Sequence, residues 1–418
     1  MKILLVTSYF PYPPIVGGKV RVWNLLKRIA ERHEVTLLSL LDSANDTQFL
    51  SDVQQYCTRV ETVVKQRRRS RGKLLLLLLK TMLKGQPPRN GIAYYEGMKR
   101  KVQEVVRSQS FDIVHLEESH MAPYVEYMAG TNNPAYLIAL HDIGATQYKR
   151  VLTIQSGLQS RFLTWLDWYF LRRWEPTYFA RHFDKCVVVS PMDRDLLRQA
   201  NPALDPVVIP NGVDTAQYEL LPESPDSKEI LFVGKMNYPP NVDGALFFYR
   251  EVFPLVQQQV PQAHLLIVGT NPLPEIQALA TDPAVEVTGH VEDVTPYYRR
   301  ACVSAVSLRA GSGTRLKILE ALALGRPVVS TSLGCEGLAV THGENILIAD
   351  TPADFANRTI QILNDEGLRQ RLVVNGRRLV ETTYDWEVIA QQLLQLYDEA
   401  ASLKINKRTA ELSFMVNR

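Results

Sequence analysis

Short apolar runs alternate with helix-like segments from the start of the chain. Residues 2–8 (KILLVTS) and 33–40 (HEVTLLSL) are nearly continuous apolar runs, which are typical of strands buried on both faces of a sheet. Between them, residues 19–32 place apolar side chains at helical intervals. A strand–helix–strand unit of this kind predicts a parallel sheet and an open α/β fold.

The same alternation continues along the chain and then begins again after a polar segment. Residues 201–229 are rich in Pro, Asn, Asp and Ser, and this change in composition indicates a domain boundary near 210–228. We therefore predict one Rossmann-like domain over 1–208 and a second over 209–385. Further strands are expected at residues 112–117, 135–140, 185–190, 230–235, 264–269, 285–290, 302–308 and 326–331.

The last part of the chain, 386–418, follows the final expected strand. Residues 386–403 have a helical period, and we expect this helix to pack back towards the N-terminal domain. Residues 405–418 are expected to form a frayed polar tail.

The composition is that of an ordinary globular protein. The chain has 418 residues, of which 46% are hydrophobic and 22% charged, and its net charge of +3 gives no global signal for binding a polyanion. The four cysteines are widely spaced and form no CxxC pair or Cys/His cluster that would suggest zinc or a disulfide framework. We therefore expect a reducing, cytoplasmic compartment.

Neither a signal peptide nor a membrane span is expected. The N-terminus, MKILLVTSYF, has one lysine, a short apolar run and no small-residue cleavage site before the prolines. The longest apolar run, 74–79, is far shorter than the roughly 18–20 residues that a span needs.

The segment RAGSGTRLKILEALALG combines a glycine-rich turn, two cations and one acid. Its pattern predicts a helix over 313–324 that Gly325 ends. The free N–H groups at the helix start, with Arg315 and Lys317, suit a phosphate group, and Glu320 one turn further suits the paired hydroxyls of a ribose. The segment follows a strand, where ligands of open α/β sheets bind. It therefore indicates a nucleotide-diphosphate site, although an amphipathic helix with solvated charges fits the pattern as well.

The same segment resembles the signature of the retaining, nucleotide-sugar-dependent glycosyltransferases of family four. GSGTRLKILEALALGRPVVST is followed by GLAVTHGENILIAD, while VIPNGVD and ILFVGKMNYPPNVDGALFF resemble the family's interdomain segment and the start of its second domain. The resemblance covers nearly the whole chain and is most specific from 208 to 350. It implies a GT-B architecture, in which two Rossmann-like domains face each other across a cleft. The acceptor would bind the first domain and the nucleotide sugar the second.

The resemblance also assigns the carboxylates and cations of the second domain. The second Glu of the family's Glu-x7-Glu motif matches Glu320, which is implied to bind the donor ribose, whereas the first falls at Ser312 and departs from the pattern. Backbone N–H groups and Ser312 are expected to take over the contacts of the missing acid. Lys235 matches a phosphate-binding residue, but the second cation of the family falls at Asn241. Arg315 and Lys317 are expected to supply the missing charge.

Two strand ends in the first domain carry candidate residues. His141, which the resemblance matches to the active-site His that touches the donor sugar, follows a buried strand with Asp142 as its helper. Glu117, Glu118 and His120 follow another strand. These three could line the acceptor side, but we favour exposed loop charges.

The donor is expected to contact three further loops. Gly17 and Gly18 close the first strand–helix loop and would let the backbone approach the diphosphate, although a tight turn also explains them. His290 and Val291 would meet the base through backbone groups, although an ordinary strand–helix turn fits there too. The helix entry would contribute Gly311, Ser312, Gly313, Thr314, Arg315 and Leu316.

The expected catalytic set is His141, Lys235, Lys317 and Glu320. Because no Asp-x-Asp motif stands at a strand end, we expect no metal and no other cofactor.

Two segments raise the question of a membrane. Residues 65–84 place eight cations around six consecutive leucines, which indicates an anionic lipid surface as a partner, or else a buried leucine helix with a solvated basic flank. Residues 161–179 are rich in aromatic residues and arginine, and we interpret this segment as a core helix. Nucleic acid is not expected as a partner, because the basic run is isolated and no recognised binding module accompanies it.

The sequence thus predicts a retaining hexosyltransferase with a nucleotide sugar as donor. A lipid-linked glycan or a glycolipid of cell-surface polysaccharide synthesis is the expected acceptor, and the protein would be cytoplasmic or peripheral on the inner face of the cell membrane. Two alternatives remain open: a GT-B nucleotide-sugar epimerase, and a nucleotide-sugar-binding or scaffold protein without transfer activity.

Overall fold

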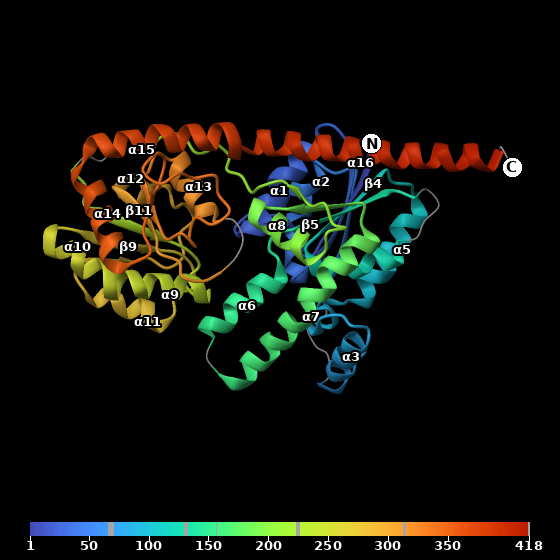
Figure 1. Cartoon of the computed structure of the whole chain (residues 1–418), viewed down its shortest axis with the longest axis horizontal. Coiled ribbons are helices and arrows are strands. Elements are labelled where there is room, and N and C mark those ends of the chain that lie inside the picture. The colour runs from blue at the N-terminus through green and yellow to red at the C-terminus, as the bar shows by residue number, and fades with distance from the viewer. Residues whose placement is uncertain (66–70, 129–132, 156, 223–225, 312–314, 417–418) are drawn as a thin grey trace. The chain divides into compact units, whose positions relative to one another are not determined.

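The chain forms two α/β units, seen in the computed structural model of Figure 1. The structure describes residues 1–416 except 66–70, 129–132, 156, 223–225 and 312–314, and it describes residues 71, 73, 154 and 405–416 by their backbone alone. One unit contains Met1–Pro210 and Ile389–Arg418, and the other contains Asn211–Val388. The divisions expected from the sequence lie at 208 and 385.

The first unit is built on a parallel sheet. Within the described residues this sheet has seven strands in the order β3-β2-β1-β4-β5-β6-β7. Its strands are β1 (Lys2–Thr7), β2 (Glu34–Leu41), β3 (Arg59–Val64), β4 (Ile113–Glu117), β5 (Ala135–Leu140), β6 (Lys185–Val188) and β7 (Val207–Val208). Its helices are α1 (Gly17–Ala30), α2 (Leu50–Gln54), α3 (Arg71–Leu83), α4 (Pro88–Ala93), α5 (Glu96–Ser108), α6 (Gly144–Ile154), α7 (Leu158–His182) and α8 (Pro191–Ala200), with the 3-10 helices η1 (Ala44–Phe49) and η2 (Ser119–Tyr127).

The second unit repeats this arrangement. Its parallel sheet has the order β10-β9-β8-β11-β12-β13 among the described residues. Its strands are β8 (Glu229–Val233), β9 (His264–Val268), β10 (Val285–Val287), β11 (Val303–Val306), β12 (Val328–Ser330) and β13 (Leu347–Ile348). Its helices are α9 (Pro239–Phe247), α10 (Phe253–Gln259), α11 (Pro274–Gln277), α12 (Thr295–Arg300), α13 (Leu316–Ala323), α14 (Pro352–Asn364) and α15 (Glu366–Leu379), with η3 (Phe248–Val252), η4 (Ala278–Thr281) and η5 (Val380–Tyr384).

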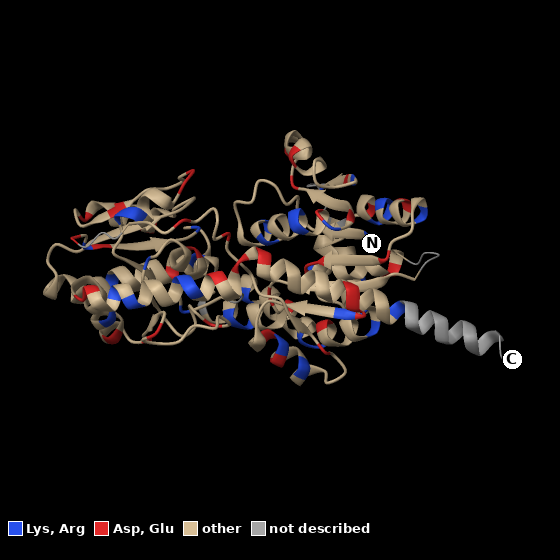
Figure 2. Cartoon of the chain, turned by 90° about the horizontal axis from the view of Figure 1, so that it is seen from above, with Lys and Arg blue, Asp and Glu red and all other residues tan. Residues whose placement is uncertain are grey.

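Both sheets are buried on both faces because helices cover them. In β1, the even positions Leu4 and Val6 and the odd positions Ile3 and Leu5 are all buried. Continuous apolar strands of this kind need an apolar layer on each side, which a parallel doubly wound sheet provides. Most charged residues lie on the helices and loops, and the strands are drawn mostly in tan in Figure 2. In both units the chain order of the sheet reverses beside the first strand, and ligands of such folds bind at the carboxyl ends of the strands there.

The last helix, α16 (Trp386–Val416), differs from the expected short helix and tail. Its backbone stays helical over most of the segment expected to be a frayed tail. Ile389, Leu393 and Tyr397 are buried, and the Tyr397 hydroxyl hydrogen-bonds Nδ1 of His115 in β4. From Ile389 onwards this helix therefore belongs to the first unit.

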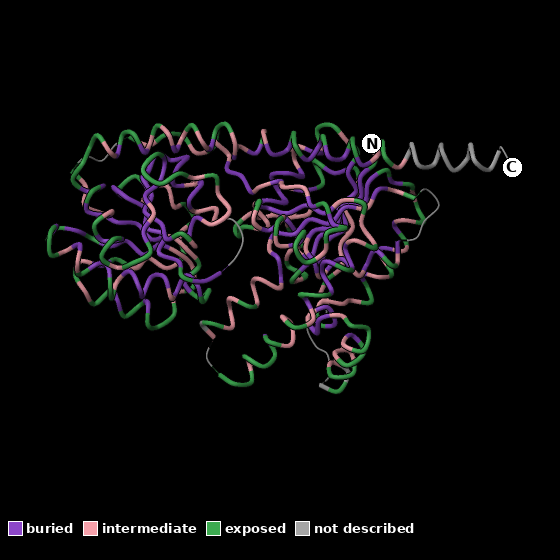
Figure 3. Tube along the Cα trace, viewed as in Figure 1, coloured by how far each residue is buried: buried purple, intermediate pink, exposed green. Residues whose placement is uncertain are grey.

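The two segments that raised the membrane question have different outcomes. Helix α3 leaves Leu75, Leu76 and Leu79 exposed, so a buried leucine helix is wrong for it. Helix α7 is core only in its second half, because Phe162 and Trp165 in its first half are exposed. Figure 3 shows these exposed turns. In the described ranges, no helix is both long and apolar enough to cross a membrane.

Candidate active site

A buried histidine is held between two glutamates in the first unit. His141 follows β5, and its Nε2 lies 2.7 Å from a carboxylate oxygen of Glu117, the last residue of β4. Its Nδ1 lies 3.2 Å from a carboxylate oxygen of Glu118 and 3.3 Å from the Tyr9 hydroxyl. Because β4 and β5 are paired parallel neighbours, their carboxyl ends place the three side chains together. The preferred interpretation of Glu117 and Glu118 as exposed loop charges is wrong, since Glu117 is only 2% exposed.

This arrangement keeps the histidine charged. Burial alone would lower the pKa of His141, but the carboxylates of Glu118 and Glu117 outweigh burial and raise this pKa to about 10. Burial also opposes ionisation of Glu118, yet the charge of His141 holds the pKa of that carboxyl near 2. At neutral pH the site therefore contains an imidazolium between two carboxylates.

Further buried polar groups surround Glu117. Its second carboxylate oxygen lies 3.5 Å from Nε2 of His115, whose Nδ1 bonds Tyr397. The buried Arg21 adds positive charge that helps to hold the pKa of Glu117 low, although burial itself and the two histidines have larger effects on that pKa. The candidate site is thus braced by α16 as well as by β4.

Gly18 lies directly against this histidine. It is the second residue of α1, and a Cβ atom there would come within 3.2 Å of His141 Nδ1 and would clash with the Tyr9 hydroxyl. Any side chain would push these groups apart, which accounts for glycine at this position. Gly17 begins the same helix.

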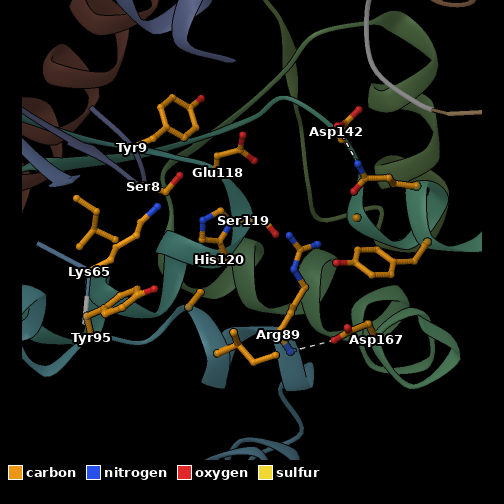
Figure 4. Close-up of a pocket in the computed structure, with 16 residues that line it drawn as sticks. Ser8, Tyr9, Lys65, Arg89, Tyr95, Glu118, Ser119, His120, Asp142 and Asp167 are labelled. Carbon is orange, nitrogen blue, oxygen red and sulfur yellow. Dashed lines mark hydrogen bonds between the residues drawn. The ribbon is translucent and has the colours of Figure 1, made fainter. Parts of the chain in front are cut away.

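A cavity of about 600 Å³ opens beside these groups, at the carboxyl ends of the strands. Its walls include Ser8, Tyr9, Lys65, Arg89, Glu118 and His120 (Figure 4). Asp142, expected to help His141, also lines this cavity and accepts a hydrogen bond from Gln147. The contacts expected of Asp142 are those that Glu117 and Glu118 make.

The second unit places a lysine and a glutamate one turn apart in α13. The Lys317 ammonium donates a hydrogen bond of 3.0 Å to Oδ1 of Asn241 and lies 5.0 Å from the centre of the Phe232 ring. The amide group of Asn241 in turn donates 3.1 Å to the carbonyl of Lys235. Asn241, where the family pattern has a cation, therefore connects the loop after β8 to the Lys317 side chain.

Burial and neighbouring charges have opposing effects on the pKa values of Lys317 and Glu320. Burial lowers the pKa of Lys317 to about 7, with Arg315 acting in the same direction and Glu320 against it. Burial raises the pKa of Glu320, and the charge of Lys317 opposes that rise. An added anion such as a diphosphate would favour the charged form of Lys317.

The entry to α13 differs in part from the expected helix over 313–324. The described helix begins at Leu316 after Arg315 and ends at Ala323, and Gly325 has a φ of +70° that suits the expected stop. Gly311 is buried. Ser312, Gly313 and Thr314 lie outside the described residues.

The other expected donor contacts lie in separate loops of the second unit. Lys235 follows β8 and is exposed. His290 is also exposed after β10, whereas Val291 and Leu316 are half-buried against the core. Within the described ranges, no group of three or more His, Cys, Asp or Glu side chains could hold a metal ion.

Sequence reasoning missed the bracing of His141. The signal was available, because Glu117 ends a short strand whose other residues are apolar except His115, and a carboxylate at such a position is buried unless the strand lies at an edge. The hydrogen bonds of Asn241 had no signal beyond its place in the motif.

Two sequence families match the chain. The family described as Glycosyltransferase Family 4 matches residues 15–217, and the family described as Glycosyl transferases group 1 matches 227–365. Phosphatidyl-myo-inositol mannosyltransferase of Mycobacterium tuberculosis is 28% identical over 318 residues, which are 72% of this chain and 77% of that protein.

Solved structures share the fold. Sucrose-phosphate synthase from Thermosynechococcus elongatus superposes with a TM-score of 0.69 at 21% identity, over 96% of this chain and 100% of that one. Anabaena HepE in complex with UDP-glucose gives 0.66 at 17% identity, with the same coverage of 96% and 100%. These likenesses confirm the predicted α/β fold class, GT-B with two Rossmann-like domains.

Proposed function

Because the chain belongs to glycosyltransferase family 4, we propose that it moves a hexose from a nucleotide-diphosphate sugar to a hydroxyl acceptor with retention of configuration. We propose a lipid-linked glycan or a glycolipid of cell-surface polysaccharide synthesis as the acceptor. The similar mycobacterial protein is named for transfer to a phosphatidylinositol, which supports a lipid acceptor.

The observation that carries the proposal is the Lys317–Glu320 pair at the start of α13. An ammonium beside a helix N-terminus suits a diphosphate, and a carboxylate one turn further suits the two hydroxyls of a ribose. This spacing matches a nucleotide diphosphate and supports a donor site on the second unit. HepE, similar in fold, has been solved with UDP-glucose.

In the proposed reaction, the bond between the sugar and the diphosphate breaks while the acceptor hydroxyl attacks from the same face. Lys317, Arg315 and Lys235 stabilise the charge that develops on the leaving diphosphate. The His141 imidazolium is assigned to the donor sugar, where it offers positive charge.

We propose that these cations make a metal ion unnecessary. Two lysines, an arginine and a helix N-terminus can neutralise a diphosphate directly. Turnover should therefore continue in excess EDTA at the rate of the untreated enzyme. A loss of turnover that Mg²⁺ or Mn²⁺ restores would show that a metal is required.

We also propose that the protein acts at the inner face of the cell membrane. The exposed leucines of α3 and aromatic residues of α7 suit an interfacial position, and the cations of 65–84 suit anionic lipids.

The function is tested by a thermal-shift screen of nucleotide sugars followed by an assay of transfer. A ligand that binds only the folded protein raises its melting temperature, so one nucleotide sugar should stand out. Glu320→Ala and Lys317→Ala should abolish both the shift and turnover, whereas Glu275→Ala, an exposed glutamate of the same unit, should leave both unchanged.

The two alternatives give different results in the same experiment. Conversion of the donor to its epimer without acceptor would identify an epimerase. A specific shift that Glu320→Ala removes, without turnover with any hydroxyl acceptor, would identify a binding protein.

A further inference from the structure

The first unit contains a second cavity next to the polar one. It measures about 420 Å³ and lies between α3, α4 and η2. Its walls include the apolar or aromatic side chains of Leu77, Tyr94, Pro123, Tyr124 and Tyr127, and the charged residues Lys80, Lys84 and Glu126 also line it. Neither His141 nor Glu118 lines it, so the site described above does not account for it.

The two cavities meet at His120 and at α4. His120 lines both of them. Along the short helix α4, Arg89 and Ile92 line the polar cavity, while Asn90 and Gly91 line the apolar one. One elongated molecule could therefore occupy both spaces and change from polar to apolar where it passes these residues.

Arg89 supplies positive charge to the polar cavity. Its guanidinium lies 4.9 Å from the centre of the Tyr148 ring and points into the cavity (Figure 4). Among the described residues it has no carboxylate within salt-bridge distance. A guanidinium stacked on a ring and without an acid partner is a typical binding group for phosphate.

The carboxylates of this cavity are already bound elsewhere. Glu118 pairs with His141, and Asp142 accepts from Gln147. Asp167 accepts from the backbone N–H of Arg89 rather than from its side chain. Lys65, the other full cation, pairs with Asp42. The buried Glu175, which does not line the cavity, attracts the Arg89 guanidinium without reaching salt-bridge distance, so no carboxylate that lines the cavity pairs with this guanidinium.

Two buried polar groups at the junction have no partner in the described part of the chain. One is the side-chain amide of Asn90, a residue that is 4% exposed, and both its nitrogen and its oxygen lack a partner. The other is Nδ1 of His120. A buried polar group without a hydrogen bond costs about 1–3 kcal/mol. The oxygen atoms of a phosphate ester would accept hydrogen bonds from the Asn90 amide nitrogen and from a protonated Nδ1 of His120, whereas Asn90 Oδ1 would accept from a hydroxyl group of the ligand.

The apolar cavity is reached from an exposed apolar helix. The half-buried Leu77 of α3 lines the cavity, as does the exposed Leu83, and Leu75, Leu76 and Leu79 of the same helix are also exposed. A helix that is apolar on both sides can lie in the lipid interface and line a passage for a lipid chain.

We propose that the acceptor is a lipid phosphate that occupies both cavities. Its phosphate binds Arg89, Asn90 and His120, its hydrocarbon chain fills the space beside Leu77, and its hydroxyl-bearing end lies in the polar cavity near Glu118. This inference rests on the proposed function and names the chemical class of the acceptor.

The test is isothermal titration calorimetry of the full chain without donor. Each amphiphile is used below its critical micelle concentration. Dodecyl phosphate should bind at least about tenfold more tightly than inorganic phosphate, which lacks the chain, and than dodecyltrimethylammonium, which has the opposite charge. Equal affinity for dodecyl phosphate and inorganic phosphate, or for dodecyl phosphate and the cationic amphiphile, would overturn the inference.

Two variant pairs locate the ligand. Arg89→Gln should weaken dodecyl phosphate about tenfold or more and Arg89→Lys less, while Arg100→Gln on the exposed face of α5 should have no effect. Leu77→Trp should fill the apolar cavity and reduce dodecyl phosphate to the affinity of inorganic phosphate, while Leu76→Trp, which adds the same bulk at an exposed position, should not. Wild-type affinity in both Arg89→Gln and Leu77→Trp would refute this placement.

A nucleotide-sugar thermal shift on each variant separates the two proposals. A shift that persists and needs Glu320 shows that the variant is folded and that the donor site is intact, so that a failure of dodecyl phosphate binding then counts against the lipid inference alone. Absence of any nucleotide-sugar shift in the wild type would instead count against the proposed function.

Discussion

His141 of the first unit is buried and Lys317 of the second unit is half-buried, and their surroundings shift their pKa values in opposite directions. His141 lies between two carboxylates that keep it protonated, whereas Lys317 has an amide, a ring and one glutamate around it. The pKa of His141 is therefore raised and that of Lys317 lowered. The charge of the first is fixed at neutral pH, and the charge of the second responds to what binds beside it.

The fixed charge of His141 predicts an unusual titration. Its ring should stay protonated well above pH 7, because its pKa is raised to about 10. A histidine whose folded pKa is raised stabilises the fold below its unfolded pKa, near 6.5, and loses that contribution as the pH rises through about 10. Imidazole NMR should show no midpoint for this residue between pH 6 and 8.

The variant Glu117→Gln checks the cause of this titration. It removes the 2.7 Å partner and should move the midpoint towards the ordinary range, while Glu61→Gln, at a partly buried carboxylate of β3, should not. A wild-type midpoint near 6.5 would show that the two glutamates do not hold the charge.

The lowered pKa of Lys317 predicts a pH-dependent affinity for the donor. Only the ammonium form attracts a diphosphate, and above pH 7 its fraction in the free protein falls by up to about tenfold per pH unit. The Kd of the nucleotide sugar should therefore rise between pH 7 and 9. Lys317→Arg, which stays charged, should flatten this dependence. A Kd that is equally steep in Lys317→Arg would assign the titration to another group.

At this scale the sequence identified some side chains and not their surroundings. Lys317, Glu320 and His141 stand out because of their places in a motif and at a strand end. The bracing of His141 depends on pairing between β4 and β5, which brings residues together that are distant along the chain. A single sequence does not reveal contacts between residues that are distant along the chain.

At the scale of elements, long apolar strands were predictable and short or mixed ones were not. Strands β1 and β5 are nearly continuous apolar runs and β2 and β4 are mostly apolar, which a buried strand explains well. In contrast, β3 alternates charged with apolar residues, and β7 and β13 have two residues each. All three lie at or next to a sheet edge or are very short, so their sequences carry little strand signal.

Helix α7 shows why composition alone misplaces a helix. Its apolar and aromatic residues made a core position reasonable, and its second half does bury Leu171, Trp174 and Phe179. Its first half extends beyond the core, so aromatic residues with the same composition are exposed there. The sequence does not reveal where along a 25-residue helix the core ends.

The packing of α16 predicts a strong dependence of the first unit on one leucine. Leu393→Ala should lower the free energy of unfolding by about 2–5 kcal/mol, because the side chain is fully buried. Leu403→Ala, in the same helix at an exposed position, should cost less than about 0.5 kcal/mol. Urea unfolding followed by circular dichroism measures both, and equal effects would show that α16 does not pack as described.

At the scale of the whole molecule, the apolar surface of the first unit predicts binding to membranes. Phe162→Ser with Trp165→Ser should weaken binding to vesicles containing phosphatidylglycerol by about tenfold or more, because both side chains are exposed and large. Val374→Ser, an exposed apolar residue of α15, is the matched control. Co-sedimentation at two salt concentrations measures the effect, and equal binding by the double variant and the control would exclude α7 as the contact.

The overall architecture was the most predictable feature. The strand–helix alternation repeats after a polar segment, and this pattern alone indicated two doubly wound units. That the first unit is built from both ends of the chain could be predicted only in part. Helical periodicity indicates a helix but does not indicate which surface the helix packs against.

Because the first unit is formed from both ends of the chain, it cannot be completed until the end of synthesis. The surface that Ile389, Leu393 and Tyr397 cover belongs to a sheet whose strands leave the ribosome first, and residues 211–388 must be translated in between. At about 5–20 residues per second, this interval lasts roughly 10–40 seconds. The ribosome therefore completes residues 211–388 while the part of the first unit that is already synthesised still exposes the apolar surface that α16 later covers.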